Sequence, residues 1–246
     1  MAFVAMMVGG AFAQSSFTLK LGASFPQGKF GEGDKNRWGL SSNDKRGGAG
    51  TGFSVGGEWV KAVSGVEGLG VLFSVDAIYN GLNSDIKDAV DELEEELEDD
   101  NSISDYSIYK PSYINIPLMV GLNYSYALNG TLSVFGNAGI GANVRIITPA
   151  VEEYVYENES AEAEYKYTNS FTPAVTLSWR IGVGMKVNDK FSISLEYYVL
   201  GDSKVKGKYE STSYYSTTGN HSENSYDFKY GKINPTMLLL RLGIYL

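Results

Sequence analysis

The only histidine of the chain, His221, is the first candidate for acid–base chemistry. It lies in the polar run TTGNHSENSYD, next to Ser222 and Glu223 and close to Asp227. The members of a hydrolase triad usually converge from different elements, so proximity in sequence is weak support for one. The chain also lacks cysteine, a phosphate-binding loop, a paired-carboxylate site and a metal-ligand motif. We therefore expect no catalytic residue, no enzyme activity, no cofactor and no metal.

An acidic segment accounts for the net charge of the chain. The formal charge is −9, and residues 85–100 alone hold ten acidic side chains and one lysine. The segment predicts an amphipathic helix over about 84–100 with a polar N-cap and one apolar stripe. Its acids form either a site for divalent cations or a basic partner, or simply a solvated face. The capping and stripe positions are Asn83 or Ser84, then Ile86, Val90, Leu93 and Leu97.

Tyrosine is concentrated in two polar stretches, 147–172 and 201–234. Tyrosine gives a large contact area at a low cost in conformational entropy, which is typical of binding loops. The alternative is that strands continue beyond a membrane and form a twisted, tyrosine-rich rim. The tyrosines concerned are Tyr154, Tyr156, Tyr165, Tyr167, Tyr209, Tyr214, Tyr215, Tyr226 and Tyr230.

β-strands must position these candidates, because apolar residues alternate with polar or small ones in eight stretches. Short connections, one of them around Asn129-Gly130, alternate with long ones at about 26–51, 81–112, 147–172 and 201–234. This arrangement predicts an all-β fold, an eight-stranded antiparallel up-and-down barrel with short turns at one end and long loops at the other. The predicted strands are 17–25, 52–60, 69–80, 114–126, 132–145, 175–186, 191–199 and 236–246.

The two faces of these strands differ in chemistry. One face is aliphatic and uncharged in the strand cores, whereas the other is rich in Gly, Ser and Asn and carries one or two charges per strand. A solvated surface would carry more charge and less glycine, so we expect the aliphatic face to contact lipid and the polar face to fill the lumen. A soluble lipocalin-like barrel is the alternative. The chain shows no basic stripe for nucleic acid.

The polar face therefore predicts a charge network inside the barrel. Arg241 has Glu58, Asp76 and Glu196 as candidate partners. The charges either line a narrow water path or close the lumen, and the small bore of eight strands favours closure. The residues of the predicted network are Lys20, Glu58, Asp76, Arg145, Arg180, Lys186, Glu196 and Arg241.

The first residues are expected to lie outside the barrel. The run AFVAMMVGGAFA is apolar and ends in an A-x-A-like pattern, which predicts an export signal peptide at 1–13 and a single barrel domain at 14–246. The run lacks a basic region, so either the natural start lies upstream or the signal is atypical.

Three segments resemble strands of the OmpA/OmpX-like and PorT-like outer-membrane β-barrel families: YINIPLMVGLNYSY (113–126), GFSVGGEWV (52–60) and FSISLEYYVLGD (191–202). The resemblance covers nearly all of residues 17–246. It implies a barrel in the bacterial outer membrane, with short periplasmic turns and long extracellular loops. Many family members end in an aromatic residue, whereas this chain ends Tyr245-Leu246.

The resemblance says little about function. We expect a monomer that contacts lipid and lipopolysaccharide, with a structural or surface-interaction role through loops that bind a protein or another surface ligand. A narrow pore and an enzyme at the barrel rim are the alternatives.

Overall fold

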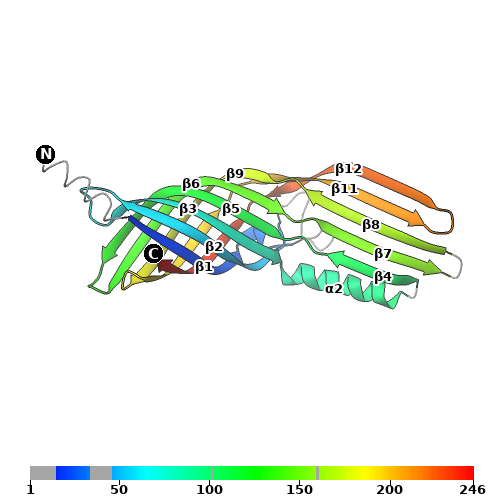
Figure 1. Ribbon diagram of the computed structural model, residues 1–246, viewed down its shortest axis with the longest axis horizontal. Coiled ribbons are helices and arrows are strands. Elements are labelled where there is room, and N and C mark those ends of the chain that lie inside the picture. The colour runs from blue at the N-terminus through cyan, green and yellow to red at the C-terminus, as the bar shows by residue number, and fades with distance from the viewer. Residues whose placement is uncertain (1–14, 34–45, 101, 159–160) are drawn as a thin grey trace.

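The computed structural model describes residues 15–33, 46–100, 102–158 and 161–246. The molecule is elongated, with a closed barrel at one end and an open sheet at the other (Figure 1). The predicted signal peptide, residues 1–13, and its cleavage site lie outside the described residues.

Eight antiparallel strands close the barrel in the order β1-β13-β10-β9-β6-β5-β3-β2. Each of them overlaps one of the eight predicted ranges, and β1 pairs with β13, so the barrel has no free edge. The prediction of an eight-stranded up-and-down barrel is confirmed. The strands are β1 (Ser15–Pro26), β2 (Ala49–Ala62), β3 (Leu69–Leu82), β5 (Tyr113–Ala127), β6 (Leu132–Ile147), β9 (Ala174–Val187), β10 (Phe191–Val199) and β13 (Thr236–Tyr245).

The exterior of the barrel is a continuous apolar surface. Leu177 is 80 % exposed and Leu242 is 65 % exposed, whereas the residues next to them along the strands, Ser178 and Arg241, are buried in the lumen. A soluble barrel would have these two faces reversed, because its apolar side chains would fill the interior. Lipid must therefore cover this surface, and the barrel is transmembrane. None of the described helices is long and apolar enough to cross a bilayer.

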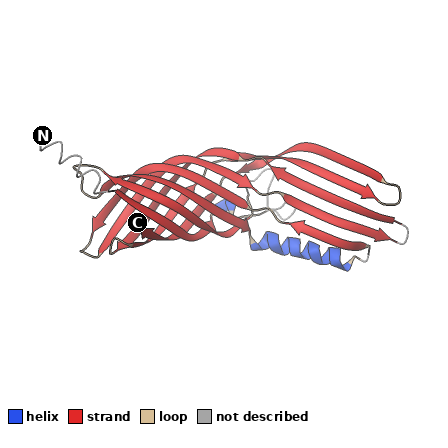
Figure 2. Cartoon of the chain, in the orientation of Figure 1, coloured by secondary structure: helices blue, strands red, loops and turns tan. Residues whose placement is uncertain are grey.

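Five further strands correct the prediction that the long connections are loops. They form a second sheet in the order β12-β11-β8-β7-β4, beyond one end of the barrel (Figure 2). This order matches the barrel order β13-β10-β9-β6-β5, so five barrel strands each continue into the sheet after a break of two or three residues. The strands are β4 (Ile103–Tyr109), β7 (Ala150–Asn158), β8 (Ala161–Phe171), β11 (Ser203–Tyr215) and β12 (Asn220–Ile233).

Proline or glycine marks every one of these five breaks. Proline has no N–H to donate to a neighbouring strand, so strand pairing often ends beside it. The break between β10 and β11 instead contains Gly201, which has a positive φ of 83°. The other four breaks contain Pro111, Pro149, Pro173 and Pro235, four of the six prolines of the chain.

The predicted acidic helix is present as α2 (Ser84–Asp99), which lies along β4 (Figure 1). Ile86 and Val90 of its apolar stripe are buried in the mouth of the barrel, but Leu93 is exposed. Lys110 joins the helix to the sheet, since its Nζ lies 2.5 Å from Asp91 Oδ1. The helix thus closes the barrel with its first half and borders the sheet with its second.

Asn83 is the N-cap of α2 and also joins the helix to the first long connection, which contains the short 3-10 turn η1 (Gly28–Phe30). Its Oδ1 accepts a hydrogen bond from the Ile86 N–H at 3.0 Å, and its Nδ2 donates to the Gly31 carbonyl at 2.6 Å. We expect Asn83→Ala to lower stability by about 1 kcal/mol, the usual effect of removing an N-cap. Urea titration followed by far-UV circular dichroism measures it.

The control for this prediction is Ser84→Ala. Ser84 is the other N-cap candidate of the sequence, but it is the first residue of the helix itself. An equal loss of stability in both variants would contradict the assignment of Asn83 as the cap.

Candidate functional site: a closed lumen beneath a tyrosine-rich sheet

A buried network of seven side chains fills the middle of the lumen. Three cations and three anions balance each other, and a tyrosine lies among them. Every member is at most 3 % exposed. The members of this lumen network are Lys20, Glu58, Asp76, Arg180, Glu196, Tyr198 and Arg241.

Glu196 on β10 is the centre of the lumen network, because all three cations contact it. Lys20 Nζ and Arg180 Nη1 each lie 3.0 Å from its carboxylate, and Arg241 Nη2 also donates to it. Glu58 accepts from Lys20 at 2.8 Å and from Arg180. Of its three predicted partners, Arg241 pairs with Glu196 and Asp76, while Glu58 pairs with the other two cations.

Tyr198 and Asp76 complete the lumen network. The Tyr198 hydroxyl accepts from Arg180 Nη1 at 2.7 Å and from Arg241 Nη2 at 3.0 Å, and it donates to Asp76 Oδ2 at 2.8 Å. Arg241 Nη1 also donates to Asp76. The alternation of β10 places Tyr198 on the polar face of its strand, but Tyr198 was not among the predicted members. The sequence feature that identifies Tyr198 as a member is its position two residues after Glu196, which places both side chains on the same face of the strand.

Two predicted members, Arg145 and Lys186, lie apart from the lumen network. Each lies six residues along its strand from the level of Arg180, which corresponds to about 20 Å. Arg145 is buried near the sheet end, where its Nη1 donates to the Ile233 carbonyl at 3.4 Å. Lys186 lies near the short-turn end, where it pairs with Asp189 at 2.7 Å. Alternation predicted the correct face for both residues but not the height of either along the barrel.

Glycines opposite the carboxylates make room for the lumen network. A Cβ at Gly56 would collide with Asp76 Oδ1, and a Cβ at Gly182 would lie 2.7 Å from Glu196 Cγ. Both glycines are the direct cross-strand partners of the residues that they accommodate. The small residues of the polar face are therefore needed to fit large charged side chains into a narrow bore.

An apolar cluster closes the mouth of the barrel between the lumen network and the sheet. It combines residues from the first long connection, from α2 and from the upper ends of the barrel strands. At the opposite end, a cavity of about 270 Å³ reaches inward as far as Glu58. Within the described residues, the lumen is therefore closed at the sheet end and open only at the short-turn end. Members of the cluster include Phe30, Ile86, Val90, Tyr113, Leu200, Val205 and Ile233.

Beyond the mouth, one face of the second sheet carries a tyrosine cluster. Neighbouring rings have centroids 4.8–6.2 Å apart and extend over four strands. Of the nine predicted loop tyrosines, seven belong to this cluster. These tyrosines stand on strands and not on loops, as the rim alternative proposed. The tyrosine cluster consists of Tyr154, Tyr156, Tyr165, Tyr167, Tyr209, Tyr215 and Tyr226.

The tyrosine cluster lies on the same side of the sheet as the barrel interior. Phe171 follows Tyr165 and Tyr167 on the same face of β8, and it packs against the apolar cluster in the mouth. Ile108 of β4 and Tyr230 of β12 make the same contact from the two edges of the sheet. We call this side the inner face of the sheet.

The inner face is ordered and almost uncharged. Tyr154 donates a hydrogen bond to the Tyr167 hydroxyl at 3.1 Å, and the Tyr165 and Tyr215 hydroxyls lie 3.0 Å apart. The hydrogen bond to Tyr215 raises the pKa of Tyr165 to about 12, so the Tyr165 hydroxyl stays protonated at neutral pH. On the strands as described, Glu152 is the one charged residue of this face, and burial raises its pKa.

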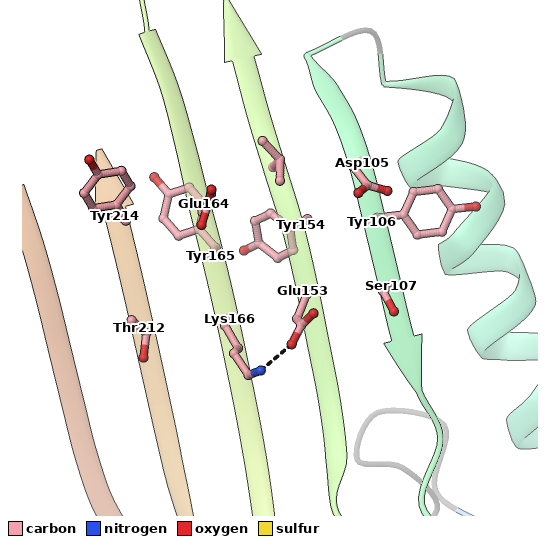
Figure 3. Close-up of a pocket in the computed structure, with 11 residues that line it drawn as sticks. Asp105, Tyr106, Ser107, Glu153, Tyr154, Glu164, Tyr165, Lys166, Thr212 and Tyr214 are labelled. Carbon is pink, nitrogen blue, oxygen red and sulfur yellow. Dashed lines mark ion pairs between the residues drawn. The ribbon is translucent and has the colours of Figure 1, made fainter. Parts of the chain in front are cut away.

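The outer face of the sheet has the opposite character. A groove of about 350 Å³ crosses it, and Asp105, Glu153, Glu164 and Lys166 lie along that groove (Figure 3). Lys166 Nζ pairs with Glu153 at 2.5 Å. The sheet therefore separates an uncharged tyrosine surface on one side from a charged surface on the other.

The described residues assemble neither a triad nor a metal site. His221 is about half exposed on β12, the edge strand of the sheet, and its Nε2 lies 2.8 Å from Glu223 Oε1. Within the described part of the chain, no hydroxyl group is hydrogen-bonded to His221, and Ser222 points to the other face of the strand. The described acidic and histidine side chains, those of α2 included, form no group of three or more that could hold a metal ion.

No family model matches the sequence, and no curated protein matches it. Among solved structures, the chain is similar to a major outer-membrane protein of Thermus thermophilus, to the attachment invasion locus protein Ail of Yersinia pestis and to the outer-membrane protein OprG of Pseudomonas aeruginosa. The sequence identities are 12 %, 12 % and 10 %, and the TM-scores are 0.40, 0.37 and 0.37. The alignments cover 94 %, 94 % and 95 % of this chain and 99 %, 97 % and 96 % of those chains.

Similarity this distant carries no argument about ligands or activity, so the assignment rests on the geometry of the chain itself. The sheet closes on itself, its exterior is apolar, its turns are short at one end, and its connections are long at the other. These are the features of barrels that span bacterial outer membranes. The chain is an eight-stranded transmembrane β-barrel of the outer-membrane type.

Proposed function

We propose that the barrel is a membrane anchor and that the inner face of its second sheet binds a ligand outside the cell. The barrel contacts lipid, the sheet lies at the level of the lipopolysaccharide and beyond, and one chain is the working unit. The observation that carries the proposal is the tyrosine cluster itself. Seven tyrosines held on strands present a preformed surface, which binds at a lower entropic cost than a mobile loop.

The rest of the molecule favours binding over transport and catalysis. The lumen network and the apolar cluster fill the bore, which argues against a pore for solutes. The lone histidine has no assembled nucleophile beside it in the described structure, which argues against hydrolysis. The ligand we propose is an uncharged surface rich in hydrogen-bonding groups, because the inner face offers tyrosine hydroxyls and its described strand residues include a single charged side chain.

Photo-crosslinking on intact cells tests this proposal. A photoreactive amino acid is placed at Ser211, which lies opposite Tyr167 on the inner face, or at Thr212, the next residue, which points to the outer face. We expect covalent adducts from position 211 and few or none from position 212. Exchange of Tyr167 and Tyr209 for serine should remove the adducts of position 211 without preventing folding, because both side chains are only partly buried and neither belongs to the lumen network or the apolar cluster.

Equal labelling at the two positions would contradict the assignment of the inner face. Labelling at neither position would argue against surface binding altogether. Ion conductance by the purified protein in a planar bilayer would contradict the closed lumen and support the pore alternative.

A further inference from the structure

We propose that two tyrosine pairs in the sheet, Tyr154–Tyr167 and Tyr165–Tyr215, are sites of oxidative cross-linking to dityrosine. The reaction would connect β7 to β8 and β8 to β11 by covalent bonds. This inference depends on the geometry of the sheet and not on the ligand proposed above.

The hydroxyl contacts set these two pairs apart from the other tyrosines. Dityrosine forms between ring carbons that lie next to the hydroxyl-bearing carbons. Those carbons can approach each other only if the two hydroxyl ends of the rings meet. The hydroxyl oxygens are 3.1 Å apart in the first pair and 3.0 Å apart in the second. The matching ring centroids are 5.6 Å and 6.0 Å apart.

Strand register explains why the hydroxyls meet in these pairs. Tyr154 lies directly opposite Tyr165, whereas Tyr167 is one diagonal step away, opposite Glu152. Tyr215 is likewise diagonal to Tyr165, because its direct partner is Ala163. Diagonal neighbours on one face of a sheet are within reach of aromatic side chains. In this sheet the hydroxyl oxygens of the two diagonal pairs are in hydrogen-bonding contact.

The reaction needs an oxidant, and hydrogen peroxide with a haem peroxidase supplies it. The peroxide is reduced to two water molecules by taking one electron and one proton from each of the two phenols. The two phenoxyl radicals then join through ortho ring carbons, and each ring regains its aromatic character when the ortho hydrogen moves to the oxygen. The product contains one new carbon–carbon bond and has lost two hydrogen atoms.

Such a bond would have a structural consequence in this chain. The protein contains no cysteine, so a disulfide cannot hold its sheet together. The sheet is a single layer, and water reaches both of its faces. Covalent bonds across three of its five strands would hold the tyrosine cluster in place when the surrounding solution becomes oxidising.

The test treats the folded full-length protein in detergent with hydrogen peroxide and a haem peroxidase. Dityrosine fluorescence reports the reaction, and mass spectrometry of proteolytic fragments locates each bond. We expect intramolecular bonds at Tyr154–Tyr167 and Tyr165–Tyr215. Tyr167→Phe should abolish the first bond alone and Tyr215→Phe the second alone.

Tyr214→Phe is the matched control, because Tyr214 is as exposed as Tyr215 but lies on the outer face. This variant should keep both bonds. The proposal is overturned if the bonds form mainly between molecules through exposed tyrosines such as Tyr109, or if the Tyr167 and Tyr215 variants react like the parent protein. Unfolding in urea before oxidation should remove the preference for the two pairs, and an unchanged product pattern would also overturn it.

Discussion

Replacing Arg241 by leucine is expected to lower the free energy of unfolding by about 3–5 kcal/mol, the range for removing one partner of a buried ion pair. Arg241 is buried and pairs with Asp76 and Glu196, and no water-filled space adjoins it on the described sheet side, where the apolar cluster closes the mouth. The variant leaves carboxylates in the lumen that must keep their charge without this partner or take up a proton. Urea titration of protein refolded into lipid vesicles measures the loss.

Two controls show whether the loss comes from the lumen network. Lys186→Leu removes a cation from the same face of the barrel, but Lys186 pairs with an exposed aspartate near the turns, so its loss should cost less than about 1 kcal/mol. A double-mutant cycle of Arg241→Leu with Glu196→Gln should give a coupling energy of about 0.5–3 kcal/mol. A negligible cost for Arg241→Leu would mean that water fills the lumen in the native barrel.

Placing an arginine at position 240 is expected to cost about 2–4 kcal/mol, the range for a basic residue at the middle of the bilayer on the lipid face of a barrel. Leu240 lies in the middle of β13 with its side chain on the apolar exterior, next to Arg241, which points into the lumen. Moving the positive charge by one residue thus moves it from two carboxylates to hydrocarbon. The same refolding titration compares Leu240→Arg with the parent protein.

The matched control for this substitution is Leu128→Arg. Leu128 is also exposed, but it lies in the short turn between β5 and β6, near the expected membrane surface, where the cost should fall to about 0–1 kcal/mol. Equal costs at positions 128 and 240 would show that the exterior is not in contact with lipid.

The barrel was predictable because a two-residue alternation is a local property of the sequence. A run such as TMLLLRLGIYL assigns each side chain to one face of a strand without any knowledge of the fold. The lumen network was only partly predictable, because a local alternation gives the face of each residue but not its height along the barrel. Alternation placed Arg145 and Lys186 on the correct face, but their height depends on strand register, which two distant segments set together.

The second sheet was harder to predict because its strands are polar on both faces. Water reaches both sides of a single layer, so neither side imposes an apolar pattern. Two signals were nevertheless present in the sequence. Tyr154 and Tyr156, like Tyr165 and Tyr167, are spaced two residues apart, which is the period of a strand. The prolines of the long connections also lie close to the predicted barrel strands, where they mark the ends of those strands.

These prolines have a consequence for how the molecule opens. A proline or Gly201 interrupts each of the five continuing strands between the barrel and the second sheet, so the regular strand ladder stops there. Backbone hydrogen bonds at this level run singly between neighbouring chain segments, as from the Thr148 N–H to the Ser112 carbonyl. Local opening in proteins tends to follow such boundaries between cooperative units. The sheet can therefore fray and close again while the barrel stays intact in the bilayer. The amide protons of the second sheet would then exchange with solvent faster than the amide protons of the barrel strands.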